Sequence, residues 1–350
     1  MNATAPKSQT KGPITAVPAL EYDFEAYVSG AIFTPDGTPV FALGDGSLRI
    51  ADRPAPRAIQ IHRGAILSLA GTPDGAVVTG GDCGALIRTQ LDGAQETLFR
   101  AQDRWIENIA VSADGRALAC TAGRDAVVVV ADAKRLSPPR HFPHTSTAAG
   151  VAFDPKGKRL AVAHYGGVSL WWASSESQTP ALYPWRGSHL QVCYSPDGRY
   201  LLTAMQENSL HGWRIADKAH FQMSGFPAKI KSMSWGPKGR WLITSGASQG
   251  LIWSFEGKQG PIGRDAREIG DPEAPIVSVV AAHPVHNLAA MGHADGSLVL
   301  GQAIGAETAV LRTGDSAAIS ALAWSANGDR LAVGSQNGFA AVLTFKREAL

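Results

Sequence analysis

"SPDGRYLLTAMQENSLHGWR", Ser195 to Arg214, contains a Pro-Asp-Gly turn that lies between two apolar runs. Proline presets φ at the second position of such a turn, and glycine at the fourth allows the positive φ that leads into the next strand. Alternating apolar runs bounded by turn residues are typical of β-strands. The stretch therefore predicts a β-hairpin, and related hairpins recur along the chain.

The recurring turns are spaced 38 to 47 residues apart. The eight copies begin at Thr34, Thr72, Ser112, Asp154, Ser195, Gly236, His283 and Ser325. Each copy has one apolar run before the turn and a second run after it. A tight glycine turn leads into a third run, as in "DGSLVLGQ" from Asp295, and a looser fourth run ends the copy. Four antiparallel strands repeated at this period predict a β-propeller, in which the sheets pack radially and cover each other's faces.

The repeats resemble those of the WD-repeat family. That family places Gly-His about ten residues before the turn, and here His62 lies ten residues before Thr72 and His144 ten before Asp154. Aspartates of the second turn match at Asp45, Asp82 and Asp295, whereas the closing Trp-Asp is replaced by Trp171-Trp172, Trp213-Arg214 and Ala51-Asp52. The resemblance covers roughly Ile14 to Lys346 and implies a propeller that presents one face to protein partners.

The eight copies predict an all-β propeller of eight four-stranded antiparallel blades, with seven, the commoner number in the family, as the alternative. Seven blades would require one irregular copy, for which the candidate is Gly257 to Pro284, where the spacing rises to 47 residues. Because the last copy ends after its third strand, we expect Pro13 to Tyr22 to supply the fourth and close the ring. The prediction is one propeller domain at 13–346, between a flexible N-terminal tail at 1–12 and a C-terminal tail at 347–350.

The composition argues against several classes of partner. The net charge is only +2, and no long basic run is present, so nucleic acid is not an expected partner. The sequence contains no apolar stretch of about 18 residues, so no membrane span is expected. The three cysteines are far apart and the N-terminus lacks a secretory pattern, so we expect free thiols and a cytoplasmic protein.

Sequence motifs for catalysis and cofactors are missing. The chain has no phosphate-binding loop, His-Glu-x-x-His, Cys-x-x-Cys or Gly-x-Ser-x-Gly, so we expect a protein that is not an enzyme and has no cofactor. His283, His286 and His293 are the nearest metal candidate, but they fall in turns at opposite ends of a blade. The alternative function, an enzyme or a small-ligand or metal binder that uses the central channel, needs polar groups at one mouth. The first-strand positions are instead small or neutral: Gly30, Ser68, Asn108, Gly150, Gln191 and Ser232.

Aromatic residues occupy two distinct kinds of position. Phe33, Phe153, Tyr194, Trp235 and Trp324 directly precede turns, where we expect them to pack between blades. Trp105 and Trp185 instead stand beside arginines in loops that lead from a fourth strand into the next first strand. In WD-repeat propellers such loops open onto the face commonly used for partners, and a Trp-Arg pair suits an interface anchor.

These loops predict a docking surface for a protein or peptide. It consists of Tyr27, His62, Arg63, Arg104, Trp105, Trp185, Arg186, His189 and Lys229. An aromatic and basic surface of this kind suits an acidic or extended protein segment. The competing interpretation is that each tryptophan fills its own loop. The sequence thus predicts a non-catalytic protein–protein interaction scaffold.

Overall fold

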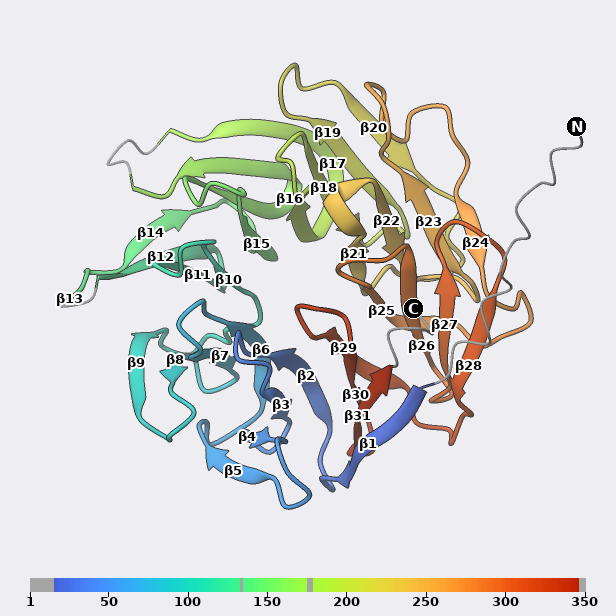
Figure 1. Cartoon of the computed structure of the whole chain (residues 1–350). Helices are drawn as coiled ribbons and strands as arrows, with labels where there is room; N and C mark the ends of the chain where they lie inside the picture. Colours follow the sequence, from blue (N-terminus) through green and yellow to red (C-terminus); the bar gives the residue numbers. More distant parts are fainter. Residues whose placement is uncertain (1–15, 133–134, 175–178, 346–350) are drawn as a thin grey trace, which may run out of the picture.

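A computed structural model describes residues 16–132, 135–174 and 179–345 of the chain. The predicted tails at 1–12 and 347–350 lie outside these residues. Within them the regular structure is entirely β, apart from one 3-10 turn, η1 (Pro237–Gly239). The sheets are arranged radially around a central axis, as expected of a propeller (Figure 1).

The strands form seven hydrogen-bonded sheets. Five of them are four-stranded: β2 (Val28–Phe33), β3 (Pro39–Leu43), β4 (Ser47–Ile50) and β5 (Arg57–Gln60); β6 (Ile66–Gly71), β7 (Val77–Gly81), β8 (Ala85–Thr89) and β9 (Gln95–Arg100); β21 (Met233–Trp235), β22 (Trp241–Thr244), β23 (Gly250–Ser254) and β24 (Arg267–Ile269); β25 (Val277–Ala282), β26 (Leu288–His293), β27 (Leu298–Gln302) and β28 (Thr308–Arg312); and β29 (Ile319–Trp324), β30 (Arg330–Ser335) and β31 (Phe339–Phe345) with β1 (Ala16–Asp23).

The other two sheets are larger. The first has five strands: β10 (Ile109–Val111), β11 (Ala117–Ala122), β12 (Asp125–Asp132), β13 (Arg135–Leu136) and β14 (Arg140–Pro143). The second has six: β15 (Gly150–Phe153), β16 (Arg159–Trp172), β17 (Ala181–Tyr194), β18 (Tyr200–Met205), β19 (Leu210–Arg214) and β20 (His220–Met223).

The prediction of eight separate four-stranded blades is therefore wrong, and the alternative of seven is the number of sheets observed. The reason is that two repeat copies, with turns at Asp154 and Ser195, share the six-stranded sheet. The first part of β17 pairs with β16 and its second part with β18, so one strand belongs to both copies. The ends of β16 meet, since Ala173 N donates to Lys158 O at 2.9 Å, so this element supplies two neighbouring strands. Eight repeat copies are thus arranged in seven sheets.

The irregular region was also expected in the wrong place. The stretch from Gly257 to Pro284 supplies β24 and β25 to two ordinary four-stranded sheets. Its extra length lies in the loops around β24, which leave the strand pairing intact. A longer spacing between turns therefore did not mark the place where the copies join.

Closure of the ring by the N-terminal strand is confirmed. β1 pairs antiparallel with β31, from Ala16 opposite Phe345 to Asp23 opposite Phe339 (Figure 1). Of the segment predicted for this role, residues 13–15 lie outside the described residues. Because the first and last described strands share one sheet, their ladder of hydrogen bonds removes an open edge.

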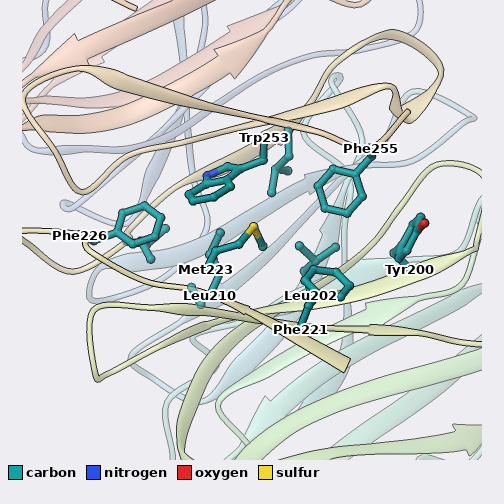
Figure 2. Packing of buried hydrophobic residues seen from close by; sticks show 11 residues of the cluster. Tyr200, Leu202, Leu210, Phe221, Met223, Phe226, Trp253 and Phe255 are labelled. Atoms are coloured by element: carbon teal, nitrogen blue, oxygen red, sulfur yellow. The ribbon is translucent and has the colours of Figure 1, made fainter. Parts of the chain in front are cut away.

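The core lies between neighbouring sheets. Figure 2 shows one cluster in which Tyr200, Leu202 and Phe221 face Trp253 and Phe255 of the next sheet. Tyr200 lies edge-on to Phe255, with ring centroids 5.2 Å apart. Burying each large apolar side chain stabilises the fold by about 1.5–3 kcal/mol. The contacts between neighbouring sheets therefore supply the apolar burial that a single blade cannot provide.

Polar side chains on the inner strands link successive repeat copies. Each donates to a backbone carbonyl of the next copy: Ser68 to Ile106, Asn108 to Ala149, Gln191 to Lys231, Ser232 to Val280, Ser278 to Ile319 and Ser320 to Val28. At Gly150 a Cβ atom would come within 3.0 Å of Leu190 O, so glycine permits the close approach there. These inner residues thus join the copies around the channel.

Candidate functional site

The loops that lead from fourth strands into first strands lie at the same end of the propeller as the second-to-third-strand turns. We call this end the loop face, formed by residues such as 24–27, 61–65, 101–108 and 224–232 together with turns such as 82–84 and 122–125. A hydrogen bond joins the two kinds of segment, because Ala65 N donates to Asp82 Oδ2 at 3.0 Å. Residues of both kinds therefore contribute to one surface.

Trp105 is the most exposed tryptophan of this face, with 61% of its surface accessible. It borders a groove of about 210 Å³. The groove is lined by Asp103, Arg104, Trp105, Glu107, Thr121, Gly123, Thr147 and Ala148. Since Thr147 and Ala148 precede β15 while the other residues belong to the preceding copy, the groove bridges two sheets.

The loop that carries Trp105 is anchored on both sides. Ala101 N donates to Gly84 O at 2.8 Å, and Ile106 N donates to Gly81 O at 3.1 Å. The Ile106 side chain is fully buried directly after Trp105. The backbone thus fixes the indole at the surface without covering it.

Arg104 lies across the neighbouring turn. A Cβ atom at Gly123 would stand 2.9 Å from Arg104 Nη1, and the φ of Gly123 is +65°. Both facts favour glycine at this position, because a side chain there would displace the arginine and adopt a strained backbone. Arg104 and Trp105 therefore diverge from one loop, the first over a turn and the second toward the groove.

Four further residues of the predicted docking surface are exposed. Tyr27 retains 45% of its accessible surface, and Arg63, Arg186 and Lys229 are also exposed. Tyr27, Arg63 and Lys229 lie in loops of this face, whereas Arg186 lies within β17 and not in the loop predicted for it. Their exposure is compatible with a role in docking.

Trp185 differs from this expectation, because it lies within β17 rather than in a loop and is half-buried. Its ring stacks on His211 with centroids 4.1 Å apart and an interplanar angle of 16°. It also contacts His220, at a centroid distance of 5.0 Å. Trp185 therefore packs against the strands of its own sheet, which agrees better with the competing structural interpretation than with an exposed anchor.

His62 and His189 were wrongly included in the surface, since only 2% and 0% of these residues is accessible. His62 Nε2 lies 2.8 Å from Thr79 Oγ1, and His189 Nδ1 lies 2.7 Å from Thr203 Oγ1. Burial lowers the pKa of His62 to about 4, so the ring stays neutral near pH 7. His62 fastens a loop to β7, and His189 fastens β17 to β18. A threonine within each second strand was the sequence signal that we missed.

The groove beside Trp105 is mixed in charge. Asp103 and Glu107 line it together with Arg104, so the expectation of a basic surface is not met there. Sequence reasoning also missed Thr121, Gly123 and Thr147, which complete the lining. They come from a turn and from the next copy, and no pattern within the loop of Trp105 indicates them.

The described residues contain no group of three or more His, Cys, Asp or Glu side chains that could hold a metal ion. His283 Nε2 donates to Gly328 O at 3.0 Å, whereas His293 Nδ1 donates to Pro275 O at 2.7 Å. These two histidines flank β26 at opposite ends and engage different neighbours. In the part of the chain that the structure covers, no helix has the length and apolar character needed to cross a membrane.

One family model, described as "WD domain, G-beta repeat", matches residues 307–342. The matched segment runs from β28 through β29 and β30 into β31, which is the last repeat copy of the ring. No curated protein matches the chain. The match and the radial arrangement of antiparallel sheets agree on the kind of repeat from which the molecule is built.

Proposed function

The chain belongs to the WD-repeat β-propeller family, and from this we propose that it is a non-catalytic scaffold that binds a protein or peptide on its loop face. Propellers of this family generally serve as platforms for protein partners. Fold alone does not define a function, so the proposal depends on a site. That site is the groove beside Trp105.

The exposure of Trp105 on an anchored loop is the observation that carries the proposal. An indole offers 150–250 Å² of surface, on the order of what a dominant interface anchor buries. Trp105 leaves 61% of its own surface accessible although Ile106, next to it, is fully buried. Because the loop is held by backbone hydrogen bonds on both sides, little conformational entropy would be lost when a partner covers the ring.

The groove indicates what kind of partner segment fits. A volume of about 210 Å³ accommodates roughly one large side chain. Arg104 and Glu107 both line the groove and offer opposite charges to the flanking residues of that segment. We therefore expect an extended segment with one apolar anchor and charges of both signs, rather than a uniformly acidic one.

The test is a comparative affinity purification from native lysate, with quantitative mass spectrometry. The wild-type protein is compared with Trp105→Ala and with the control Val310→Ala, which removes an apolar side chain of 67% exposure from β28, a strand that does not line the groove. We expect at least one protein to be retained by the wild type and the control but depleted by Trp105→Ala. Equal recovery of every protein by all three samples would contradict the proposed site.

A further inference from the structure

A second cavity, of about 420 Å³, lies at the opposite end of the strands from the loop face. It is lined by Asp154, Pro155, Lys156, Lys158, Arg159, Trp172, Tyr194, Asp197, Gly198 and Ile215. These residues come from the first-to-second-strand turns and third-strand ends of the two copies that share the six-stranded sheet. The volume falls within the range of about 300–1,000 Å³ that is typical of small-molecule sites.

The cavity has an excess of uncommitted positive charge. Lys156, Lys158 and Arg159 line it, and none of them forms an ion pair with a carboxylate of the described residues. Asp154 Oδ1 instead accepts the backbone N–H groups of Lys158, at 2.7 Å, and of Arg159, at 3.0 Å.

The other carboxylate of the cavity is also engaged. Asp197 accepts the Ser195 hydroxyl at 2.7 Å and forms an ion pair with Arg199, which is not among the lining residues. Three cations thus face the space, while both acidic groups are held by turns. This balance favours an anionic ligand.

A flat apolar surface stands beside these charges. Trp172 leaves 45% of its surface accessible, and the Arg159 guanidinium lies 4.6 Å from the centroid of its ring. The cation–π contact orients the guanidinium while both groups still line the cavity. Ile215 adds apolar surface from the second copy. A ligand with a planar ring would find stacking surface next to its charge partners.

Tyr194 contributes a polar group that the fold does not require. The residue is only 8% exposed, and its hydroxyl has no hydrogen-bond partner among the described residues. Phe33 and Phe153 occupy the same position before their turns, so packing there does not need a hydroxyl. Burial raises the pKa of Tyr194, and the nearby Asp154 acts in the same direction. The phenol therefore keeps its proton, but its hydroxyl is buried, so Tyr194 contributes only its ring to the lining.

We propose that this cavity binds a small anion that carries a flat ring, such as an aromatic carboxylate or a nucleoside monophosphate. Arg159 and the two lysines neutralise the acidic group, and Trp172 stacks with the ring. The site does not depend on the protein partner of the loop face, because it lies at the other end of the strands.

Isothermal titration of the full chain tests the proposal with stated probes. Indole-3-carboxylate and AMP each combine a flat ring with an acidic group. Indole and adenosine contain only the ring, and inorganic phosphate contains only the acidic group. We expect at least one combined probe to bind with 1:1 stoichiometry and a Kd below about 1 mM, and each of its halves to bind at least about tenfold more weakly. AMP and indole-3-carboxylate distinguish a phosphate from a carboxylate ligand. No binding of either up to about 10 mM, or phosphate binding as tight as AMP, would overturn the proposal.

Four variants connect the binding to this cavity. Arg159→Gln is expected to weaken the best probe at least about tenfold and Lys158→Ala about threefold, since each removes one cation. Arg116→Ala removes the cation that follows the turn glycine in another copy and should change nothing. Tyr194→Phe removes a buried hydroxyl that does not reach the ligand, so it should leave binding unchanged and the melting temperature unchanged or higher. A probe that binds Arg159→Gln and Lys158→Ala as it binds the wild type does not occupy this cavity.

Discussion

The segments around Trp105 and Trp185 look alike in sequence, yet Trp105 lies exposed in a loop and Trp185 lies half-buried within β17. The side chains that lie below the two tryptophans, inside each sheet, explain the difference in burial. In the copy of Trp185, the inner positions are His189, Thr203 and His211; Thr203 pairs with His211 across β18 and β19.

The equivalent positions in the copy of Trp105 are all apolar. Ile106 takes the place of His189, and Cys120 pairs with Val127 across β11 and β12. All three belong to one buried hydrophobic cluster. Because the buried Ile106 side chain already closes this apolar interior from solvent, the Trp105 ring is not needed to cover it.

The polar interior does require a cover. Neither ring nitrogen of His211 has a hydrogen-bond partner among the described residues, although the side chain is fully buried. The Trp185 ring stacks on it, and His189 Nε2 donates to Trp185 O at 3.0 Å. The comparison shows that a tryptophan is free to act as an anchor where the blade below it is already complete.

The largest expected effect is that of Trp185→Ala on stability. Removing a half-buried indole that covers a polar interior should cost about 2–4 kcal/mol, toward the lower part of the range for buried aromatic residues. Denaturant unfolding followed by circular dichroism measures this difference, with Trp105→Ala as the matched control. Equal loss of stability in the two variants would contradict the distinction between a structural Trp185 and an exposed Trp105.

Acid should destabilise the region of Trp185 before that of Trp105. Burial lowers the pKa of His211 from its ordinary 6.5 to about 3, with His220 and His189 acting in the same direction. The unfolded chain therefore binds more protons below pH 6.5, and stability falls as the pH is lowered from 6.5 toward 3. This one group accounts for about 2 kcal/mol between pH 7 and pH 5.

Unfolding measured at pH 7, 6 and 5 checks this expectation. His211→Leu removes the titrating group and should flatten the profile relative to the wild type. His62, His144 and His283 have pKa values lowered mainly by burial to about 4, so part of the slope should remain in that variant. A profile identical in the wild type and His211→Leu would show that His211 does not titrate as described.

A smaller effect is expected at the turn under Arg104. Gly123→Ala forces a side chain into a backbone with a φ of +65° and against the guanidinium, which should cost about 1 kcal/mol. Gly75 also has a positive φ, of +87°, but a Cβ there would meet no atom within 4 Å. Gly75→Ala therefore isolates the backbone contribution, and Gly123→Ala should be the more destabilising of the two in thermal melts.

The smallest effect on stability is expected for Trp105→Ala. Its side chain is mostly exposed and Ile106 seals the core below it, so the free energy of unfolding should change by no more than about 0.5 kcal/mol. Chemical denaturation of the purified variant provides the measurement. A loss of about 2 kcal/mol would mean that Trp105 is a structural residue like Trp185.

The sequence predicts those features that depend on one copy at a time. Turn residues such as those from Ser195 to Gly198 establish the hairpins and their period, and the last copy has three strands of its own, which β1 completes. Features that depend on two copies were not predictable in this way. The pairing of β17 with both β16 and β18 depends on how neighbouring copies meet. The burial of Trp185 depends on His211, which lies 26 residues later in another strand.

The central claim is that Trp105 serves binding and Trp185 serves the fold. The most direct test is the affinity of the partner recovered by the wild-type protein for Trp105→Ala and Trp185→Ala, expressed per folded molecule. We predict that Trp105→Ala weakens binding by at least about fivefold, equivalent to about 1 kcal/mol, and that Trp185→Ala leaves it unchanged. The opposite pattern, with affinity lost in Trp185→Ala and retained in Trp105→Ala, would contradict the claim.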